Sequence, residues 1–203
     1  VPPDGFLQGV RKICDENDIL LIFDEIQSGL GRTGRMWASE HWETAPDIMC
    51  LAKGIAGGIP MGATLVKSDI LSVMRKGEHS STFGGNPVSC AAGTATIQAL
   101  TQDNLLKNAE IMGEKLFQGL TELKSKHSII REVRGKGLMI GVELKFEVKD
   151  ILLEGIKNGL LLLYSGRNIL RFLPPLVISD EDVTNTLQIL DKLLTNEEGR
   201  KNV

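Results

Sequence analysis

Two side chains in the first third of the sequence could take part in the chemistry of carbonyl compounds with amines. Lys53 stands between Ala52 and Gly54, and it does not belong to an obvious solvated helix face. Lysines that form Schiff bases need such a partly desolvated place, although a lone lysine is more often a structural or surface residue. Asp24 follows a short apolar run and so alters that balance, because a carboxylate at a strand end can pair with a cationic ring nitrogen.

Both residues follow segments that favour buried strands. Ile19–Phe23 is an unbroken apolar run, typical of a strand in a parallel sheet, and Gly5–Asn17 before it has helical spacing. Asp47–Leu51 is a second such run and ends just before Lys53. Ligands of open α/β sheets bind outside the carboxyl ends of strands, so we expect Asp24 and Lys53 to meet there. Pyridoxal phosphate needs this pair: a lysine for its aldehyde and an acid for its pyridine nitrogen.

The rest of the chain predicts an α/β first part and a smaller α+β second part. We place the domains at residues 1–103 and 104–203. The expected elements are a strand at Ala63–Val66, a small-residue helix at Val88–Leu100, a long helix at Asn104–Lys124, strand–turn–strand at Ile129–Leu144, a helix at Lys149–Gly159, strands at Leu160–Leu163 and Ile169–Phe172, a last helix to about Leu194, and a frayed polar tail at Asn196–Val203.

Composition excludes several classes of protein. The 203 residues carry a formal net charge of −3, which argues against a basic nucleic-acid surface. No apolar run reaches the roughly 18 residues that span a membrane. Cys14, Cys50 and Cys90 lie far apart, so we expect no metal site, three buried thiols and a reducing, cytoplasmic compartment. His41 and His79 are interpreted as structural, and His127 as a surface residue.

The segment Ile22–Gly34, IFDEIQSGLGRTG, closely resembles the signature of class III pyridoxal-phosphate aminotransferases. Further segments match that family in order: Pro46–Ile48, Ala52–Gly54, Gly58–Ala63, His79–Pro87, Arg134–Met139 and Leu170–Leu176. The resemblance covers essentially the whole chain. It implies the fold type I of pyridoxal-phosphate-dependent transferases, here a partial large domain with a mainly parallel sheet and a small C-terminal α+β domain.

The resemblance also implies roles around the cofactor ring. Lys53 resembles the lysine that holds pyridoxal 5′-phosphate as a Schiff base and later moves the substrate proton. Asp24 matches the partner of the pyridine nitrogen. Gln27 matches the residue near the phenolic oxygen, and Ile26 the apolar group on one ring face. The alternatives are an acid that caps a helix at Asp24 and a simple loop hydrogen bond at Gln27.

Other matches lie farther along the chain. Ser81 and Thr82 resemble the pair that reaches the cofactor phosphate of the neighbouring subunit, which implies a homodimer with sites at its interface. Arg171 resembles the arginine that binds the substrate carboxylate, for which a bidentate guanidinium is suited. The alternatives are plain turn residues at 81–82 and a surface ion pair at Arg171.

The family resemblance implies transfer of an ω-amino group from N-acetylornithine, or a similar basic amino acid derivative, to 2-oxoglutarate by a ping-pong route, in arginine or lysine biosynthesis. Other donors left open are carrier-protein-linked lysine or ornithine intermediates, ornithine and 4-aminobutyrate. Family members are about twice as long, so we expect a fragment, and a non-catalytic fragment that only binds a partner chain is the alternative of another class. A nucleotide-binding loop at Gly29–Gly34 matches GxGxxG but lacks its helix and acidic context.

Overall fold

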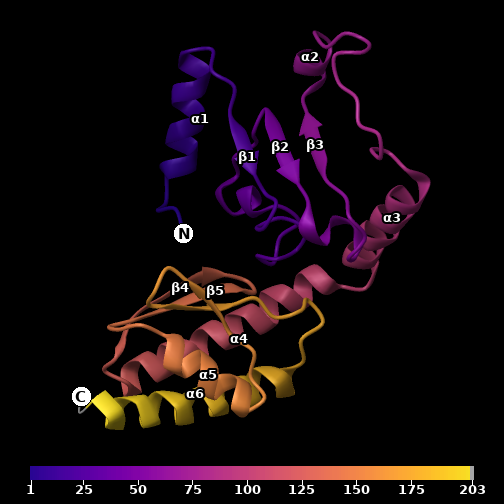
Figure 1. Ribbon diagram of the computed structural model, residues 1–203. Coiled ribbons are helices and arrows are strands. Elements are labelled where there is room, and N and C mark those ends of the chain that lie inside the picture. Colours follow the sequence, from indigo (N-terminus) through magenta and orange to yellow (C-terminus); the bar gives the residue numbers. More distant parts are fainter. Residues whose placement is uncertain (202–203) are drawn as a thin grey trace. The chain divides into compact units, whose positions relative to one another are not determined.

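The computed structural model describes residues 1–201, and the chain divides into two compact units, Pro2–Leu106 and Lys107–Val203 (Figure 1). Each unit has its own sheet, with strand order β1-β2-β3 in the first and β4-β5-β7-β6 in the second. None of the helices within residues 1–201 has the length and apolar character needed to cross a bilayer. The alternation of helices and strands is that of an α/β protein with mixed sheets.

The first unit is built around a short sheet with flanking helices. Its elements in order are α1 (Phe6–Glu16), β1 (Ile22–Asp24), the 3₁₀ helix η1 (Ala38–Trp42), β2 (Ile48–Leu51), the 3₁₀ helix η2 (Lys53–Ala56), β3 (Ala63–Val66), α2 (Ser68–Leu71) and α3 (Pro87–Gln102). Of the three cysteines, Cys14 is buried, Cys50 is half-buried and Cys90 is exposed. The expectation of buried thiols is therefore wrong for Cys90 and is met only in part by Cys50.

The sheet of the first unit is mixed rather than mainly parallel. β1 pairs with β2 in parallel, and this pair places Asp24 opposite Cys50. β3 pairs with β2 in the antiparallel sense, from Ile48 opposite Val66 to Leu51 opposite Ala63. The connection over residues 52–62 is shorter than the crossover of about a dozen or more residues that a parallel pair needs, so the chain returns antiparallel.

The carboxylate of Asp47 stabilises the end of this sheet at which β1 and β2 begin. Asp47 precedes β2, and its Oδ2 accepts hydrogen bonds from Arg11 Nη1 and from the backbone N–H of Leu21, both at 2.7 Å. Its Oδ1 accepts from Lys67 Nζ at 2.7 Å. The Leu21 amide, Lys67 and Arg11, in that order, hold the pKa of Asp47 well below its usual range. Asp47 thus ties α1, the start of β1 and the end of β3 together.

The second unit has a continuous core of its own. It contains most of α4 (Leu105–Lys126), then β4 (Ile130–Lys136), β5 (Met139–Leu144), α5 (Lys149–Lys157), β6 (Leu163–Ser165), β7 (Ile169–Phe172) and α6 (Asp180–Lys201). Leucines of α4 and α6, such as Leu120 and Leu190, pack with Val142 of β5 and Leu170 of β7 at zero exposure. The long amphipathic helix predicted at Asn104–Lys124 is α4, displaced by one or two residues.

The C-terminal region differs from the prediction. α6 continues to Lys201, through the segment expected to be frayed, while residues 202–203 lie outside the described part of the chain. His127, expected on the surface, has only 2% of its side chain exposed. Its Nδ1 lies 2.8 Å from Glu198 Oε2 and its Nε2 lies 2.6 Å from Asp191 Oδ1. This pairing holds the last turns of α6 and explains both differences.

β6 also begins later than the strand predicted at Leu160–Leu163. The Leu160 N–H donates to Gly155 O at 2.9 Å, and Gly159 has a φ of 77°. These two features complete the end of α5 with a left-handed glycine. Leu160 is therefore used to end the helix, and the strand starts at Leu163.

Candidate active site

Asp24 and Lys53 lie at the same edge of the sheet of the first unit. Asp24 is the last residue of β1 and faces Cys50 of β2 across the parallel ladder. Lys53 follows the end of β2 by two residues and begins η2. Both residues are exposed. Parallel pairing of two neighbouring strands thus brings a carboxylate and an amine to the same sheet edge, at the carboxyl ends of the strands, where ligands of open α/β sheets bind.

The carboxylate of Asp24 is only partly used by the protein. Its Oδ1 accepts a hydrogen bond from the backbone N–H of Ile26 at 3.0 Å, and among residues 1–201 it makes no other hydrogen bond or ion pair. Ile26 and Gln27 are half-buried in the turn that follows. Because an ionised carboxylate has about four acceptor positions, Asp24 can still accept a hydrogen bond from a cationic ring nitrogen.

Lys53 has an unusual backbone and an unused amine. Its φ is 51°, in the left-handed region, which costs a non-glycine residue about 1 kcal/mol. Within the described part of the chain its Nζ makes no hydrogen bond or ion pair. Strained residues of this kind persist where the surrounding structure holds them, and they cluster at functional sites.

Helix α3 supplies that surrounding structure. A Cβ on Gly93 would lie 3.0 Å from Met61 Sδ and 3.5 Å from Ile55 O, so a side chain there would require Met61 to shift by a few tenths of an ångström. Ser89 Oγ donates to Pro60 O at 3.2 Å. Asn86 caps α3 by accepting from the Ser89 N–H at 2.9 Å. The small residues of this helix therefore press on the segment that begins with Lys53.

Ser81 and Thr82 lie in the exposed loop before α3. Ser81 Oγ accepts from the Gly84 N–H at 3.0 Å, and a Cβ on Gly84 would lie 2.9 Å from Ser81 Cβ. The loop is thus a tight, exposed turn that the hydroxyl of Ser81 helps to close. No hydrogen bond described for residues 1–201 joins Ser81 or Thr82 to Asp24 or Lys53. Their assignment to a phosphate of a neighbouring subunit remains a proposal.

Arg171 belongs to the second unit, in β7. Cross-strand pairing sets Arg134 of β4, Gly141 of β5 and Arg171 in one row. Arg134 Nη1 is bound by Glu132 at 2.6 Å and by Glu143 at 2.9 Å, and Glu143 is the main cause of the raised pKa of Arg134. Arg171 makes no such ion pair among the residues described. Of the two arginines, Arg171 is the one free to bind a carboxylate.

A pocket of about 220 Å³ borders Arg171. Its lining is mostly apolar and comes from β6, β7 and the helices beneath: Leu116, Leu160–Leu163, Phe172–Pro175, Ile178 and Thr186. An unpaired guanidinium beside apolar surface suits an acid with a carbon chain.

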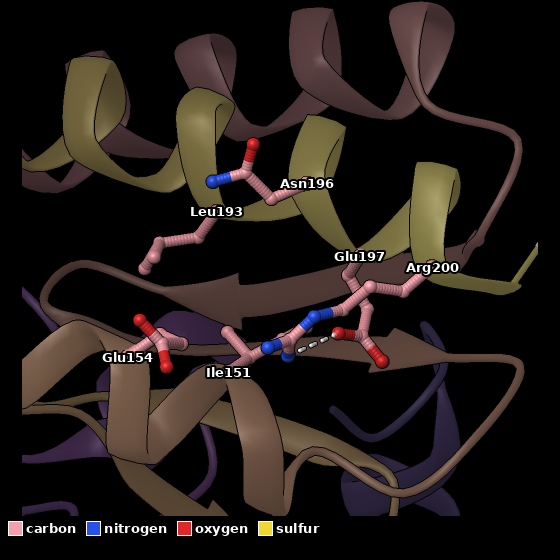
Figure 2. A pocket seen from close by; sticks show the side chains of 6 residues that line it. All are labelled: Ile151, Glu154, Leu193, Asn196, Glu197 and Arg200. Atoms are coloured by element: carbon pink, nitrogen blue, oxygen red, sulfur yellow. Dashed lines mark ion pairs between the residues drawn. The ribbon is translucent and has the colours of Figure 1, made fainter.

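Figure 2 shows a second pocket of about 290 Å³ in the same unit, between α5 and α6. It is lined by Ile151, Glu154, Leu193, Asn196, Glu197 and Arg200. Arg200 Nη1 lies 3.6 Å from Glu197 Oε2, so these two charges offset each other. None of the residues predicted for chemistry lines this pocket. Within residues 1–201 no cluster of three or more His, Cys, Asp or Glu side chains could hold a metal ion.

Glu25, the second acid of the pair at the end of the first apolar run, was given no role of its own from the sequence. It adjoins Asp24 and is 3% exposed, and each of its carboxylate oxygens accepts one hydrogen bond. The available signal was its place after a buried strand, where successive side chains point to opposite sides. An acid that points inward at that position must find partners inside the protein.

The donor set of the first unit fits pyridoxal phosphate. It offers a carboxylate for a cationic ring nitrogen, an unpaired amine for an aldehyde, and an apolar side chain and an amide beside them. These features define the class of the protein as a pyridoxal-phosphate enzyme of the α/β type.

Comparison with known proteins gives the family. The family model described as aminotransferase class-III matches residues 1–194. An acetylornithine aminotransferase of Caldanaerobacter subterraneus is 47% identical over 94% of this chain and 48% of its own length. Ornithine aminotransferase 1 of Staphylococcus saprophyticus is 42% identical over 96% of this chain and 49% of its own length. The chain belongs to the class III aminotransferases, which depend on pyridoxal 5′-phosphate.

Solved structures agree with this family. The ornithine aminotransferase of Toxoplasma gondii has a TM-score of 0.94 and 36% identity over 99% of this chain and 49% of its own, and its description reports partial occupancy of PLP at the active site. The fold is therefore that of the pyridoxal-phosphate-dependent aminotransferases. The chain spans about half the length of the curated relatives it matches.

Proposed function

We propose that this chain carries the reactive lysine of an aminotransferase that moves the ω-amino group of N-acetylornithine, or of a similar basic amino acid derivative, to 2-oxoglutarate. The observation that carries the proposal is the pair of Asp24 and Lys53 at neighbouring strand ends, with the amine unpaired and the carboxylate little used. The name of the relative from Caldanaerobacter supports the choice of amino donor.

Each residue of the first unit has a task in this proposal. Pyridoxal phosphate, when bound, supplies an aldehyde for amines and a cationic ring that attracts electrons. Asp24 accepts the hydrogen bond of the ring nitrogen and keeps that nitrogen charged. Ile26 packs on the ring and Gln27 binds its phenolic oxygen. Lys53 Nζ would hold the aldehyde carbon of the cofactor, and the same amine is placed to move the proton of the amine-bearing carbon.

The proposal assigns carboxylate binding to Arg171, because it lacks the ion pairs that Arg134 makes. Ser81 and Thr82 are proposed to donate to the cofactor phosphate of a second subunit, so that a homodimer in the cytoplasm forms two sites. Hydroxyl groups and backbone N–H groups are suitable donors for a phosphate dianion.

The nature of the donor has a second candidate. The relative from Staphylococcus and the solved structure from Toxoplasma are named ornithine aminotransferases. A panel of amines with 2-oxoglutarate separates the candidates. Formation of glutamate from N-acetylornithine but not from ornithine supports the first, and the reverse supports the second. Carrier-protein-linked lysine or ornithine belongs in the same panel.

An absorbance titration with pyridoxal phosphate tests the proposal as a whole. The chain, alone and together with the segment that its relatives have in addition, should develop the near-visible absorption of lysine-bound cofactor, and Lys53→Ala should abolish it. If no such absorption appears in either case, the proposal is wrong, and a chain that only binds a partner becomes the better interpretation.

A further inference from the structure

The carboxylate of Glu25 joins three parts of the first unit. Its Oε1 accepts from the Ser39 N–H at 2.8 Å, and its Oε2 accepts from Ser28 Oγ. Its backbone N–H donates to Cys50 O at 3.0 Å, which extends the β1–β2 ladder past Asp24. A single buried side chain therefore links the end of β1, the following turn and the start of η1.

The turn closes tightly over Glu25. Gly29 N–H donates to Glu25 O at 2.9 Å. A Cβ on Gly29 would lie 2.8 Å from Glu25 O and 3.3 Å from Trp37 Cε3, so the turn accepts only a glycine there without a shift. The turn over residues 25–29 is thus held at Gly29 by the carbonyl of Glu25 and at Glu25 by the hydrogen bonds of its carboxylate.

This anchor lies directly behind the proposed cofactor site. Successive residues of an extended chain point to opposite sides, and Asp24 is exposed where Glu25 is buried. Ile26, whose N–H donates to Asp24 Oδ1, is the next residue after Glu25. The orientation of the Asp24 carboxylate therefore depends on the backbone that Glu25 holds.

We infer that Glu25 is a positioning residue for Asp24: its buried carboxylate fixes the segment Ile26–Ser39 and so sets the direction from which Asp24 meets the ring nitrogen. The inference rests on the proposed function for the identity of the ligand. It concerns a group that contacts neither cofactor nor substrate. An acid is suited to this task because it accepts hydrogen bonds from a hydroxyl and an amide at once.

Amide hydrogen exchange in the cofactor-free protein is the first test. Glu25→Gln should speed exchange at Ser39 on the order of 10-fold, because the acceptor of its N–H loses its charge. Exchange at Ile26 should also become faster, because the backbone that directs this N–H to Asp24 is no longer held. The amides of Met49 and Cys50 in β2 should keep their rates. Glu43→Gln is the matched control, since Glu43 is exposed in the same region and its side chain makes no hydrogen bond in the described part of the chain.

Cofactor affinity in the holoenzyme is the second test. Glu25→Gln should weaken binding of pyridoxal phosphate about 10-fold, Ser28→Ala should weaken it less, and Glu43→Gln should not change it. Glu25→Gln should add no further loss in an Asp24→Asn background, because Glu25 acts through Asp24. A merely structural role would make the two losses multiply.

The results separate the two claims. A wild-type protein without Lys53-dependent absorption contradicts the proposed function, while the exchange rates of Ile26 and Ser39 still decide the role of Glu25. Three results would each overturn the inference. The first is an unchanged exchange rate at Ile26 in Glu25→Gln. The second is uniformly faster exchange, β2 included, in both Glu25→Gln and Ser28→Ala, and the third is that the affinity losses of Glu25→Gln and Asp24→Asn multiply.

Discussion

The two ends of the three-stranded sheet treat their carboxylates in opposite ways. At the end that precedes β2, Asp47 accepts hydrogen bonds from Leu21, Arg11 and Lys67, and little of its acceptor capacity is unused. At the other end, Asp24 accepts one hydrogen bond, and the amine of Lys53 has no partner within residues 1–201. One end stabilises the fold, and the other keeps charged groups available for a ligand.

This difference reflects the cost of burying polar groups. A buried carboxylate must be paired, and Asp47 is paired with two cations and an amide. Asp24 and Lys53 stay exposed and so avoid that cost. Function at the Asp24 end therefore requires rigid support from residues that are not exposed, which here are Glu25 and Gly93 of α3.

The largest expected effect is that of removing the charge of Asp24. Asp24→Asn should lower kcat by roughly 10²–10³-fold, because an electrostatic group that meets developing charge contributes that much. Steady-state kinetics of glutamate formation measure the loss. The free energy of unfolding should stay within about 0.5 kcal/mol of wild type, since the side chain is exposed. A large loss of stability in this variant would contradict the comparison.

Asp47→Asn should have the opposite profile. The change removes the ion-pair partner of Lys67 and leaves Arg11 with Asp15 alone, so it should cost on the order of 1–3 kcal/mol of unfolding free energy. Denaturant unfolding of the holoenzyme measures this cost. The absorbance of cofactor bound by the protein that remains folded should be that of wild type; a variant that folds normally but fails to bind cofactor would reverse the roles of the two ends.

Acid should affect the Asp47 end first. The folded-state pKa of Asp47 is lowered by Leu21, Lys67 and Arg11, so its stabilising contribution is present above the unfolded pKa of about 4 and is lost as pH falls through the folded pKa. Unfolding free energy measured between pH 5 and pH 2 should therefore fall, and the fall should be smaller in Asp47→Asn. An equal pH dependence of both proteins would count against this account.

The second unit should show an acid dependence of the same sign. The pKa of Asp191 is lowered by hydrogen bonds from Lys126 and His127. Burial raises the pKa of Glu198, but the hydrogen bond and charge of His127 and the amides of Ile129 and Ser128 together outweigh it. These contributions exist above the unfolded values and disappear in acid. Asp191→Asn should weaken the dependence, as measured by thermal unfolding at pH 3 and pH 7.

The smallest expected effect concerns the backbone of Lys53. Lys53→Gly and Lys53→Ala both remove the amine and should both abolish cofactor-dependent absorption. Because only glycine adopts a φ of 51° without strain, Lys53→Gly should be more stable than Lys53→Ala by about 1 kcal/mol. Denaturant unfolding in the absence of cofactor compares the two. Equal stability would mean that the backbone at this position relaxes freely.

The local parts of this fold were predictable from the sequence. Apolar runs and helical spacing indicated β2, β3, α3 and α4 to within a few residues. These features depend on neighbouring residues, which a sequence shows directly.

Features that join distant residues were not predictable in the same way. His127 was expected at the surface because nothing beside it shows its partners, which are Asp191 and Glu198 on another helix. The continuation of α6 depends on that same pairing. No role was predicted for Glu25, since that role depends on Ser39, fourteen residues later. The antiparallel β3 depends on how a loop turns, which periodicity does not reveal.

The central claim is that Lys53 holds the cofactor while Asp24 faces it. Reduction of the pyridoxal-phosphate-loaded protein with borohydride, followed by peptide mass spectrometry, tests this claim directly. The account predicts that the reduced cofactor is attached to Lys53 and that Lys53→Gly leaves no labelled peptide. Attachment to another lysine such as Lys67, or the absence of a labelled peptide in protein that forms glutamate, would contradict it.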